Sequence, residues 1–188
     1  MDAVAAELAT GRSFDTMSLR EVAKLAGIAP TSFYRHFHHL EDLGLALIEE
    51  HGISLFALME NVRSQVTDGR SLIRASVEAV YDFILANQGL SRMIVQESLS
   101  PESPFREASE NLFLAMSSDL AEYLEQEARK RGVPVGYPRL AANAMVSIMF
   151  TTGISLLNAP KADRDRHVEA AVIKLKMIML GAESLAAR

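Results

Sequence analysis

Residues 18–39 read SLREVAKLAGIAPTSFYRHFHH, and this stretch decides the fold of the N-terminal part of the chain. Its first half spaces apolar side chains three or four positions apart, at Leu19, Val22, Ala23 and Ala26. That spacing is typical of a helix with one buried face. We therefore expect a short amphipathic helix to begin after Ser18.

Capping residues mark where this helix ends and where a second one begins. Ser18 and Glu21 have the S-x-x-E spacing of a capping box. Gly27 suits the left-handed backbone that ends a helix, and Pro30 suits the first turn of the next one, where its missing N–H costs nothing. The sequence thus predicts two short helices joined by a three-residue turn, which is the spacing of a helix-turn-helix.

The second helix is expected to have an apolar and a polar side. Phe33 and Phe37, four positions apart, predict the buried side. The outward side lacks acids and is rich in hydrogen-bond donors, which suit phosphate oxygens and the edge of guanine. Two helices packed without any nucleic acid would have the same spacing, but the acid-free face in an otherwise acidic chain favours DNA binding. The outward residues are Thr31, Ser32, Tyr34, Arg35, His36 and His38.

Composition excludes several other classes of protein. The chain has 188 residues, 49% of them apolar, and a formal net charge of −5. It has no cysteine, which excludes disulfide scaffolds, thiolate metal sites and cysteine nucleophiles. The apolar runs are short, so we expect a cytoplasmic protein with no membrane-spanning segment.

The rest of the chain has helical periodicity and no alternating run that would predict a strand. We therefore expect an all-α fold. The shift from short to long helices near residue 40 is the expected domain boundary, between residues 1–40 and 41–188. The long helices are expected at 40–66, 71–87, 91–99, 104–131, 138–158 and 163–187.

The segment GIAPTSFYRHF, residues 27–37, resembles the signature of TetR-type transcriptional regulators, most closely their FabR and DesT branch of unsaturated fatty-acid synthesis repressors. The resemblance is strong over residues 12–45 and extends weakly beyond them. It implies a three-helix DNA-binding domain, with helices near 1–10, 18–26 and 30–36, and a larger helical effector domain. It also implies a homodimer on a palindromic operator in double-stranded DNA. The expected DNA contacts are Ser18, Ala29, Pro30, Thr31, Ser32, Tyr34, Arg35, His36 and His39.

The charge of the N-terminal segment departs from this family's pattern. Residues 1–45 contain four Lys or Arg and six Asp or Glu, which sum to −2. The family also carries a basic arm before its first helix, whereas this chain begins within that expected helix. Either residues precede this sequence or its affinity for phosphate is weak.

The effector domain is rich in methionine, which fills irregular apolar space. A tightly packed core would have the same composition. The resemblance favours an apolar tunnel for a long-chain acyl-CoA or acyl-ACP thioester, with its phosphates near Arg74, Arg92 or Arg106. The expected ligand-binding residues are Met59, Phe83, Met93, Phe113, Met116, Met145 and Met149.

A stripe on the last two helices has small residues beside large ones, which lets helices approach closely. It is buried either within one chain or between two copies, and the resemblance favours a two-fold dimer. The expected dimer residues are Ala144, Ile148, Val172, Leu175 and Met179.

No motif predicts catalysis. The chain lacks G-x-S-x-G, a Walker loop and G-x-G-x-x-G. Residues 36, 38 and 39 are histidines that point in different directions on one helical turn, so we expect no metal and no cofactor. The sequence favours a ligand-responsive repressor of lipid-synthesis genes rather than an enzyme. The alternative is an all-helical lipid-binding or interaction protein that does not use its helix-turn-helix.

Overall fold

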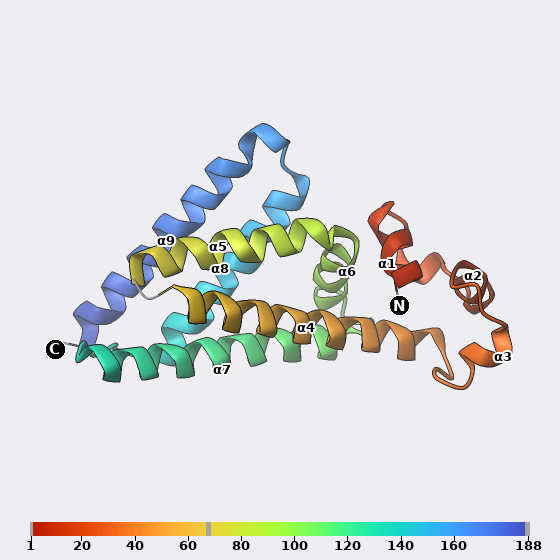
Figure 1. Ribbon diagram of the computed structural model, residues 1–188, viewed down its shortest axis with the longest axis horizontal. Helices are drawn as coiled ribbons and strands as arrows, with labels where there is room; N and C mark the ends of the chain where they lie inside the picture. Colours follow the sequence, from red (N-terminus) through yellow and green to blue (C-terminus); the bar gives the residue numbers. More distant parts are fainter. Residues whose placement is uncertain (1, 67–68, 187–188) are drawn as a thin grey trace. The chain divides into compact units, whose positions relative to one another are not determined.

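The computed structural model describes residues 2–66 and 69–186, which form helices with no strand among them, so the expected all-α class is confirmed. The long helices begin and end within a few residues of the expected positions. The α-helices (Figure 1) are α1 (Asp2–Ala9), α2 (Leu19–Leu25), α3 (Pro30–Phe33), α4 (Leu40–Gln65), α5 (Gly69–Ala86), α6 (Gln88–Ser98), α7 (Arg106–Arg131), α8 (Pro138–Asn158) and α9 (Arg164–Ala186). Short 3-10 helices, η1 (Phe14–Thr16) and η2 (Lys161–Asp163), precede α2 and α9.

α3 is shorter than the helix expected over residues 30–36. After Phe33 the backbone continues in tighter turns, in which the N–H groups of Arg35 and His36 donate to carbonyls three residues earlier. The expected helix is therefore corrected to one turn of α-helix followed by turns.

The chain divides into two compact units that do not follow the expected boundary after residue 40. The first contains residues 2–55 and 83–111, and the second contains the described residues of 56–82 and 112–188. Three long helices, α4, α5 and α7, contribute residues to both units. The separate DNA-binding and effector domains, 1–40 and 41–188, stay a prediction.

In the first unit, glycines allow two close approaches. A Cβ at Gly89, near the start of α6, would lie 2.2 Å from the backbone of Leu8, so α1 and α6 touch only because this position is glycine. A Cβ at Gly44 in α4 would lie 2.5 Å from the ring of Phe105. That ring packs edge to face against Phe14, with centroids 5.3 Å apart. α1 and η1 are thus held by contacts with α6, α4 and the residue before α7.

In the second unit, α8 and α9 form an antiparallel pair joined by η2 (Figure 1). Small residues lie in their contact: Ala142 and Ala171 are completely buried, as is Val172. α8 is also long and apolar enough to span a membrane by length and composition, which the sequence analysis did not anticipate. A core helix meets the same criterion, and α8 packs against α9 inside this unit.

Candidate functional site

The helix-turn-helix is held by the local contacts that its sequence predicts. The Ser18 hydroxyl accepts the Glu21 N–H at 3.3 Å, and the Glu21 carboxylate accepts the Ser18 N–H at 2.9 Å, which completes the capping box. Gly27 has a φ of +67°, and the N–H of Ile28 donates to the carbonyl of Ala23 at 3.0 Å. This bond is the outer bond of a Schellman motif. The turn between α2 and α3 is therefore fixed by residues 18–28 alone.

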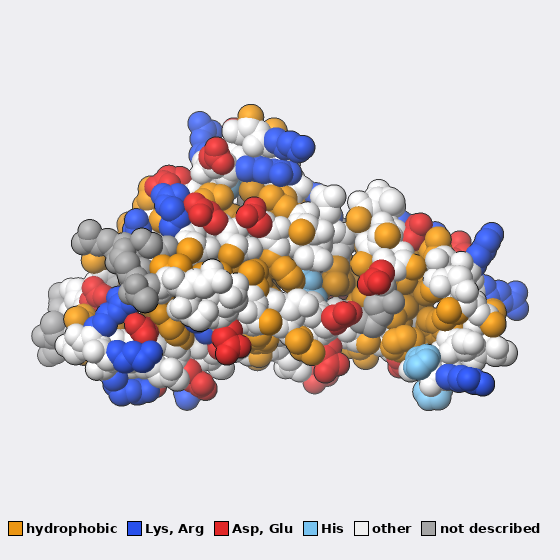
Figure 2. Space-filling model, in the orientation of Figure 1, with side chains coloured by type: hydrophobic (Ala, Val, Ile, Leu, Met, Phe, Trp, Pro, Cys, Tyr) orange, Lys and Arg blue, Asp and Glu red, His pale blue; other side chains and the backbone are white. Residues whose placement is uncertain are grey.

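The two sides of α3 lie as expected. Phe33 is 4% exposed and packs against the half-buried Phe37, with ring centroids 5.4 Å apart. Tyr34, on the other side, is 53% exposed. Lys, Arg and His side chains gather over α2 and α3 in Figure 2. Of the expected DNA contacts, Ser32 is half-buried, and the exposed ones are Ser18, Ala29, Pro30, Thr31, Tyr34, Arg35, His36 and His39.

Ion pairs change the charge that this surface presents. Arg12 lies 3.1 Å from the carboxylate of Glu21 and 3.7 Å from that of Glu7, so its charge is matched within the chain. Hydrogen bonds from Ser18 and Arg12 lower the pKa of Glu21 to about 2. Arg20 and Lys24 are exposed on α2 and form no ion pair within the described residues. Arg20 and Lys24 are absent from the DNA contacts that the sequence predicted, although their outward positions on the amphipathic helix could have indicated them.

Asp42, near the start of α4, is another acidic side chain that forms hydrogen bonds within the chain. The Asp42 carboxylate accepts the backbone N–H groups of His38 at 2.8 Å and His39 at 3.0 Å. These bonds lower the pKa of Asp42. The negative charge of Asp42 therefore serves to begin a helix directly after the turns that follow α3.

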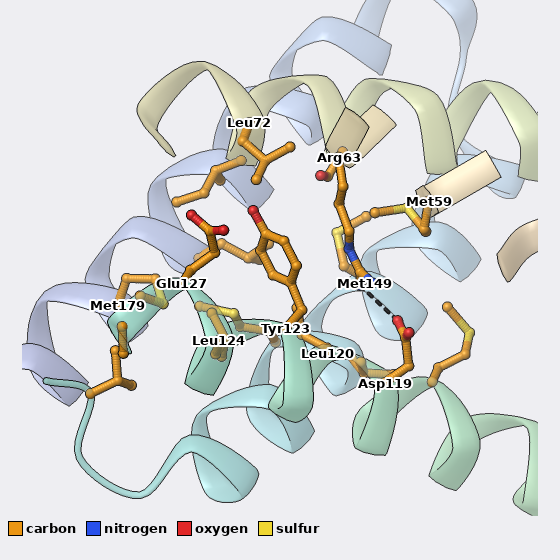
Figure 3. Close-up of a pocket in the computed structure, with 18 of the residues that line it drawn as sticks. Met59, Arg63, Leu72, Asp119, Leu120, Tyr123, Leu124, Glu127, Met149 and Met179 are labelled. Atoms are coloured by element: carbon orange, nitrogen blue, oxygen red, sulfur yellow. Dashed lines mark ion pairs between the residues drawn. The ribbon is translucent and has the colours of Figure 1, made fainter. Parts of the chain in front are cut away.

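The second unit contains a cavity of about 180 Å³. Residues of α4, α5, α7, α8 and α9 line it, together with two valines of the loop before α8. Most of the lining is apolar (Figure 3). Methionine is prominent, with Met59, Met116, Met145, Met149 and Met179 among the lining residues.

The cavity brings together only part of the expected ligand-binding set. Met59, Met116, Met145 and Met149 line it. The other three expected residues do not. Phe83 packs against His51 with ring centroids 4.7 Å apart, Met93 is buried in the first unit, and Phe113 packs edge to face against Phe150 at 6.1 Å.

The polar residues at the cavity differ from those that the sequence suggested. Arg63 of α4 forms an ion pair with Asp119 of α7 at 2.7 Å, and its guanidinium carbon lies 4.5 Å from the ring centroid of Tyr123. Arg131 also lines the cavity, 3.2 Å from Glu127. No sequence signal separated these residues from other helical arginines, because the cavity is formed by helices far apart in the chain.

The three arginines proposed for ligand phosphates do not line this cavity. Arg74 pairs with Glu169 and Glu78, which raise its pKa, and Arg106 pairs with Glu110 at 2.8 Å. Arg92 lies in the first unit, and its side chain or backbone takes part in another interaction within the protein. Within residues 2–66 and 69–186, no three His, Asp or Glu side chains gather closely enough to hold a metal ion.

The expected dimer stripe is only partly at the surface. Val172 is completely buried and Leu175 is 7% exposed, so neither presents a face to a second copy. Leu175 and Met179 line the cavity instead. Ala144 and Ile148 are half-buried on α8. The large exposed apolar side chains of α8 and α9 are Leu140, Ile173, Met177, Leu180 and Leu185.

Comparisons with known proteins agree with this architecture. Residues 3–47 match the family model described as bacterial regulatory proteins, tetR family. FadR from Bacillus halodurans, a fatty acid degradation regulator, is 20% identical over 96% of this chain and 95% of that chain, with a TM-score of 0.68. PfmR from Thermus thermophilus, a TetR family regulator, is 23% identical over 93% and 94%, with a TM-score of 0.66. FadR from Bacillus subtilis, solved with stearoyl-CoA, is 17% identical over 91% and 95%, with a TM-score of 0.71.

Residues 3–47 therefore match the tetR family model, and the chain has the TetR-type fold along most of its length.

Proposed function

We propose that the protein is a cytoplasmic, dimeric repressor that binds a palindromic operator and responds to a hydrophobic effector. The exposed, acid-free face of α3, within a domain that matches the tetR family model, carries this proposal. Tyr34 and Arg35, in the turns directly after α3, are the main DNA contacts, one through a phosphate oxygen and the other through a phosphate or a guanine edge. Arg20 and Lys24 supply positive charge to this surface, because the charge of Arg12 is matched within the chain.

The proposed effector is a long-chain acyl thioester, and the regulated genes are those of fatty-acid or lipid metabolism. The apolar, methionine-rich cavity supports this choice, because flexible thioether side chains adapt to a long chain. A similar fold from Bacillus subtilis has been solved with stearoyl-CoA. The FabR and DesT branch of the family stays the preferred model for the physiological role.

The proposed dimer interface is formed by the exposed apolar side chains of α8 and α9. Leu140 is 68% exposed, and Met177 and Leu180 are each 66% exposed. Such residues gain most from burial against a second copy, and a two-fold arrangement is the usual one for a homodimer. The proposed interface contains these exposed residues in place of the buried Val172 and Leu175. It keeps Ala144 and Ile148 from the expected set.

The long helix α4 provides the proposed route from effector to DNA. It begins at Leu40, directly after the turns that follow α3, and its later residues Met59 and Arg63 line the cavity. A ligand that displaces the end of α4 would alter the separation of the two α3 helices of a dimer. Half-sites lie about 34 to 36 Å apart on one face of DNA, so a shift of a few ångströms removes one major-groove contact.

The test is binding of the wild type to duplex DNA from upstream of its own gene, measured as a gel shift at several salt concentrations. We expect specific binding that weakens steeply with salt. Acyl-CoAs of increasing length, saturated and monounsaturated, are then titrated with and without that DNA. Affinity should rise with chain length until the cavity is full, and DNA affinity should change about 5- to 150-fold. Absence of specific DNA binding would contradict the repressor assignment, whereas absence of any acyl-CoA effect would contradict the effector alone.

The dimer is tested with Met177→Glu, which places a charge in the proposed interface. We expect sedimentation as a monomer and loss of operator binding, because one α3 contacts only half of the operator. Leu114→Glu is the matched control, since Leu114 is also exposed but lies on α7. A Met177→Glu protein that stays dimeric would contradict this interface.

A further inference from the structure

Tyr123 provides a hydrogen-bonding group inside the largely apolar cavity. It belongs to α7, and its ring lies under the guanidinium of Arg63, 4.5 Å from the guanidinium carbon to the ring centroid. Asp119, one turn earlier on α7, holds Arg63 at 2.7 Å. Figure 3 shows the Tyr123 hydroxyl pointing toward Leu72 and Glu127, on the other side from the ion pair. The ring is thus fixed in place while its hydroxyl faces the cavity.

The hydroxyl of Tyr123 is available as a donor. Within the described residues, no hydrogen bond of this hydroxyl contributes to its pKa. Burial and the negative charge of Glu127 raise its pKa, so it stays protonated at neutral pH. Glu127 beside it already pairs with Arg131 and Lys130, so this donor gains free energy when a ligand supplies an acceptor in the largely apolar cavity.

The charged residues that line the cavity disfavour the binding of a ligand carboxylate. Arg63 is matched by Asp119, and Glu127 is shared between Arg131 and Lys130. Glu183 adds a third acidic side chain to the lining, and Arg63 and Arg131 are the Lys or Arg residues among the described side chains that line it. A ligand carboxylate would have to leave water and compete with Asp119 or Glu127 for an arginine. An uncharged carbonyl needs only one donor.

We infer that Tyr123 recognises the polar end of the effector by donating its hydroxyl hydrogen to an uncharged carbonyl next to an apolar chain, and that the site discriminates against free carboxylates. This inference rests on the proposal that the cavity is the effector site. Arg63 is a positioning residue here, because it touches the ring of Tyr123 and needs no contact with the ligand.

The test uses three probes that share one apolar chain: lauroyl-CoA, methyl laurate and laurate. Their affinities for the full-length protein are measured by calorimetry and by shifts in melting temperature. We expect the wild type to bind lauroyl-CoA and methyl laurate more tightly than laurate. Tyr123→Phe removes the hydroxyl and keeps the ring, and it should weaken both carbonyl probes about three- to tenfold. Tyr137→Phe is the matched control, since Tyr137 is 67% exposed and does not line the cavity.

A second variant tests the charge selection by a gain of binding. Asp119→Asn leaves the Arg63 guanidinium without its carboxylate, and laurate should then bind about tenfold more tightly through a charge-assisted bond. Methyl laurate should change little. The Asp119→Asn protein should keep its helical spectrum, because Asp119 is half-buried at the cavity and not in the core.

The possible outcomes separate this inference from the proposed function. If the wild type binds the carbonyl probes and Tyr123→Phe binds them equally well, Tyr123 is not the recognition residue, although the cavity remains the effector site. If laurate binds the wild type as tightly as methyl laurate and Asp119→Asn changes neither, the charge selection is wrong. If no probe binds the wild type, the effector proposal and this inference both fail.

Discussion

The helix-turn-helix and the cavity differ in how far apart in the sequence their determinants lie. Residues 18–28 contain the capping box, the glycine and the closing hydrogen bonds that fix the turn before α3. The cavity instead requires five helices whose residues range from Phe56 to Glu183. Local signals therefore determine the geometry of the helix-turn-helix, whereas the cavity depends on long-range packing. Four variants test this difference, from the largest expected effect to the smallest.

The largest effect is expected on DNA affinity, from replacing Tyr34 and Arg35 together by alanine. Each lost contact is expected to cost about 1 to 3 kcal/mol if both side chains bind the operator as proposed. Both side chains are exposed, so the melting temperature should stay close to that of the wild type. A gel shift and a thermal melt check the two expectations. Unchanged operator affinity in the double variant would show that α3 is not the recognition helix.

Phe33→Ala should act on stability rather than on the DNA surface. Phe33, the last residue of α3, is 4% exposed, and its removal leaves a cavity that should cost about 3 to 5 kcal/mol. Denaturant unfolding measures this loss. Phe37→Ala is the control, because Phe37 is only half-buried and should cost less. Normal stability of Phe33→Ala would mean that the two faces of α3 are reversed.

The sequence could predict the helix-turn-helix almost completely, whereas for the cavity it could predict only the kind of residues that line it. The spacing of Ser18, Glu21, Gly27 and Pro30 specified both helices and their turn. Only the end of α3 differed, because the chain needs a turn before Asp42 can begin α4. In the second region, periodicity predicted the long helices but not their neighbours. Val172 has the same apolar pattern as an interface residue, yet α8 and α9 bury it within one chain.

His51 is a buried polar residue whose environment also depends on long-range packing. It lies in the middle of α4, is 8% exposed and packs against Phe83, at 4.7 Å between ring centroids. Burial lowers its pKa from 6.5 to about 4. The folded state therefore keeps His51 neutral between these values, while the unfolded chain takes up a proton.

It follows that acidification should destabilise the fold through His51. The free energy of unfolding should be unaffected by this group above about pH 6.5 and should fall by roughly 3 kcal/mol as the pH drops from 6.5 toward 4. His51→Gln should remove that part of the pH dependence, and His36→Gln, at an exposed site, should leave it in place. Denaturant unfolding at several pH values makes the measurement. Equal pH profiles for the wild type and His51→Gln would show that His51 is not buried as a neutral ring.

The smallest effect is expected from Ser18→Ala, which removes a single local signal. The Ser18 hydroxyl accepts the Glu21 N–H and donates to the Glu21 carboxylate at 2.8 Å, so the change should cost about 1 kcal/mol. Ser13→Ala is a close control, because Ser13 precedes η1 without any capping bond from its side chain.

Ser18→Ala also decides whether Ser18 contacts DNA. Well below the melting temperature the protein stays folded despite the lost cap, so an operator affinity equal to the wild type would assign the hydroxyl to the cap alone. A loss of affinity at that temperature, together with normal helix content, would instead assign it a second role at the phosphate backbone.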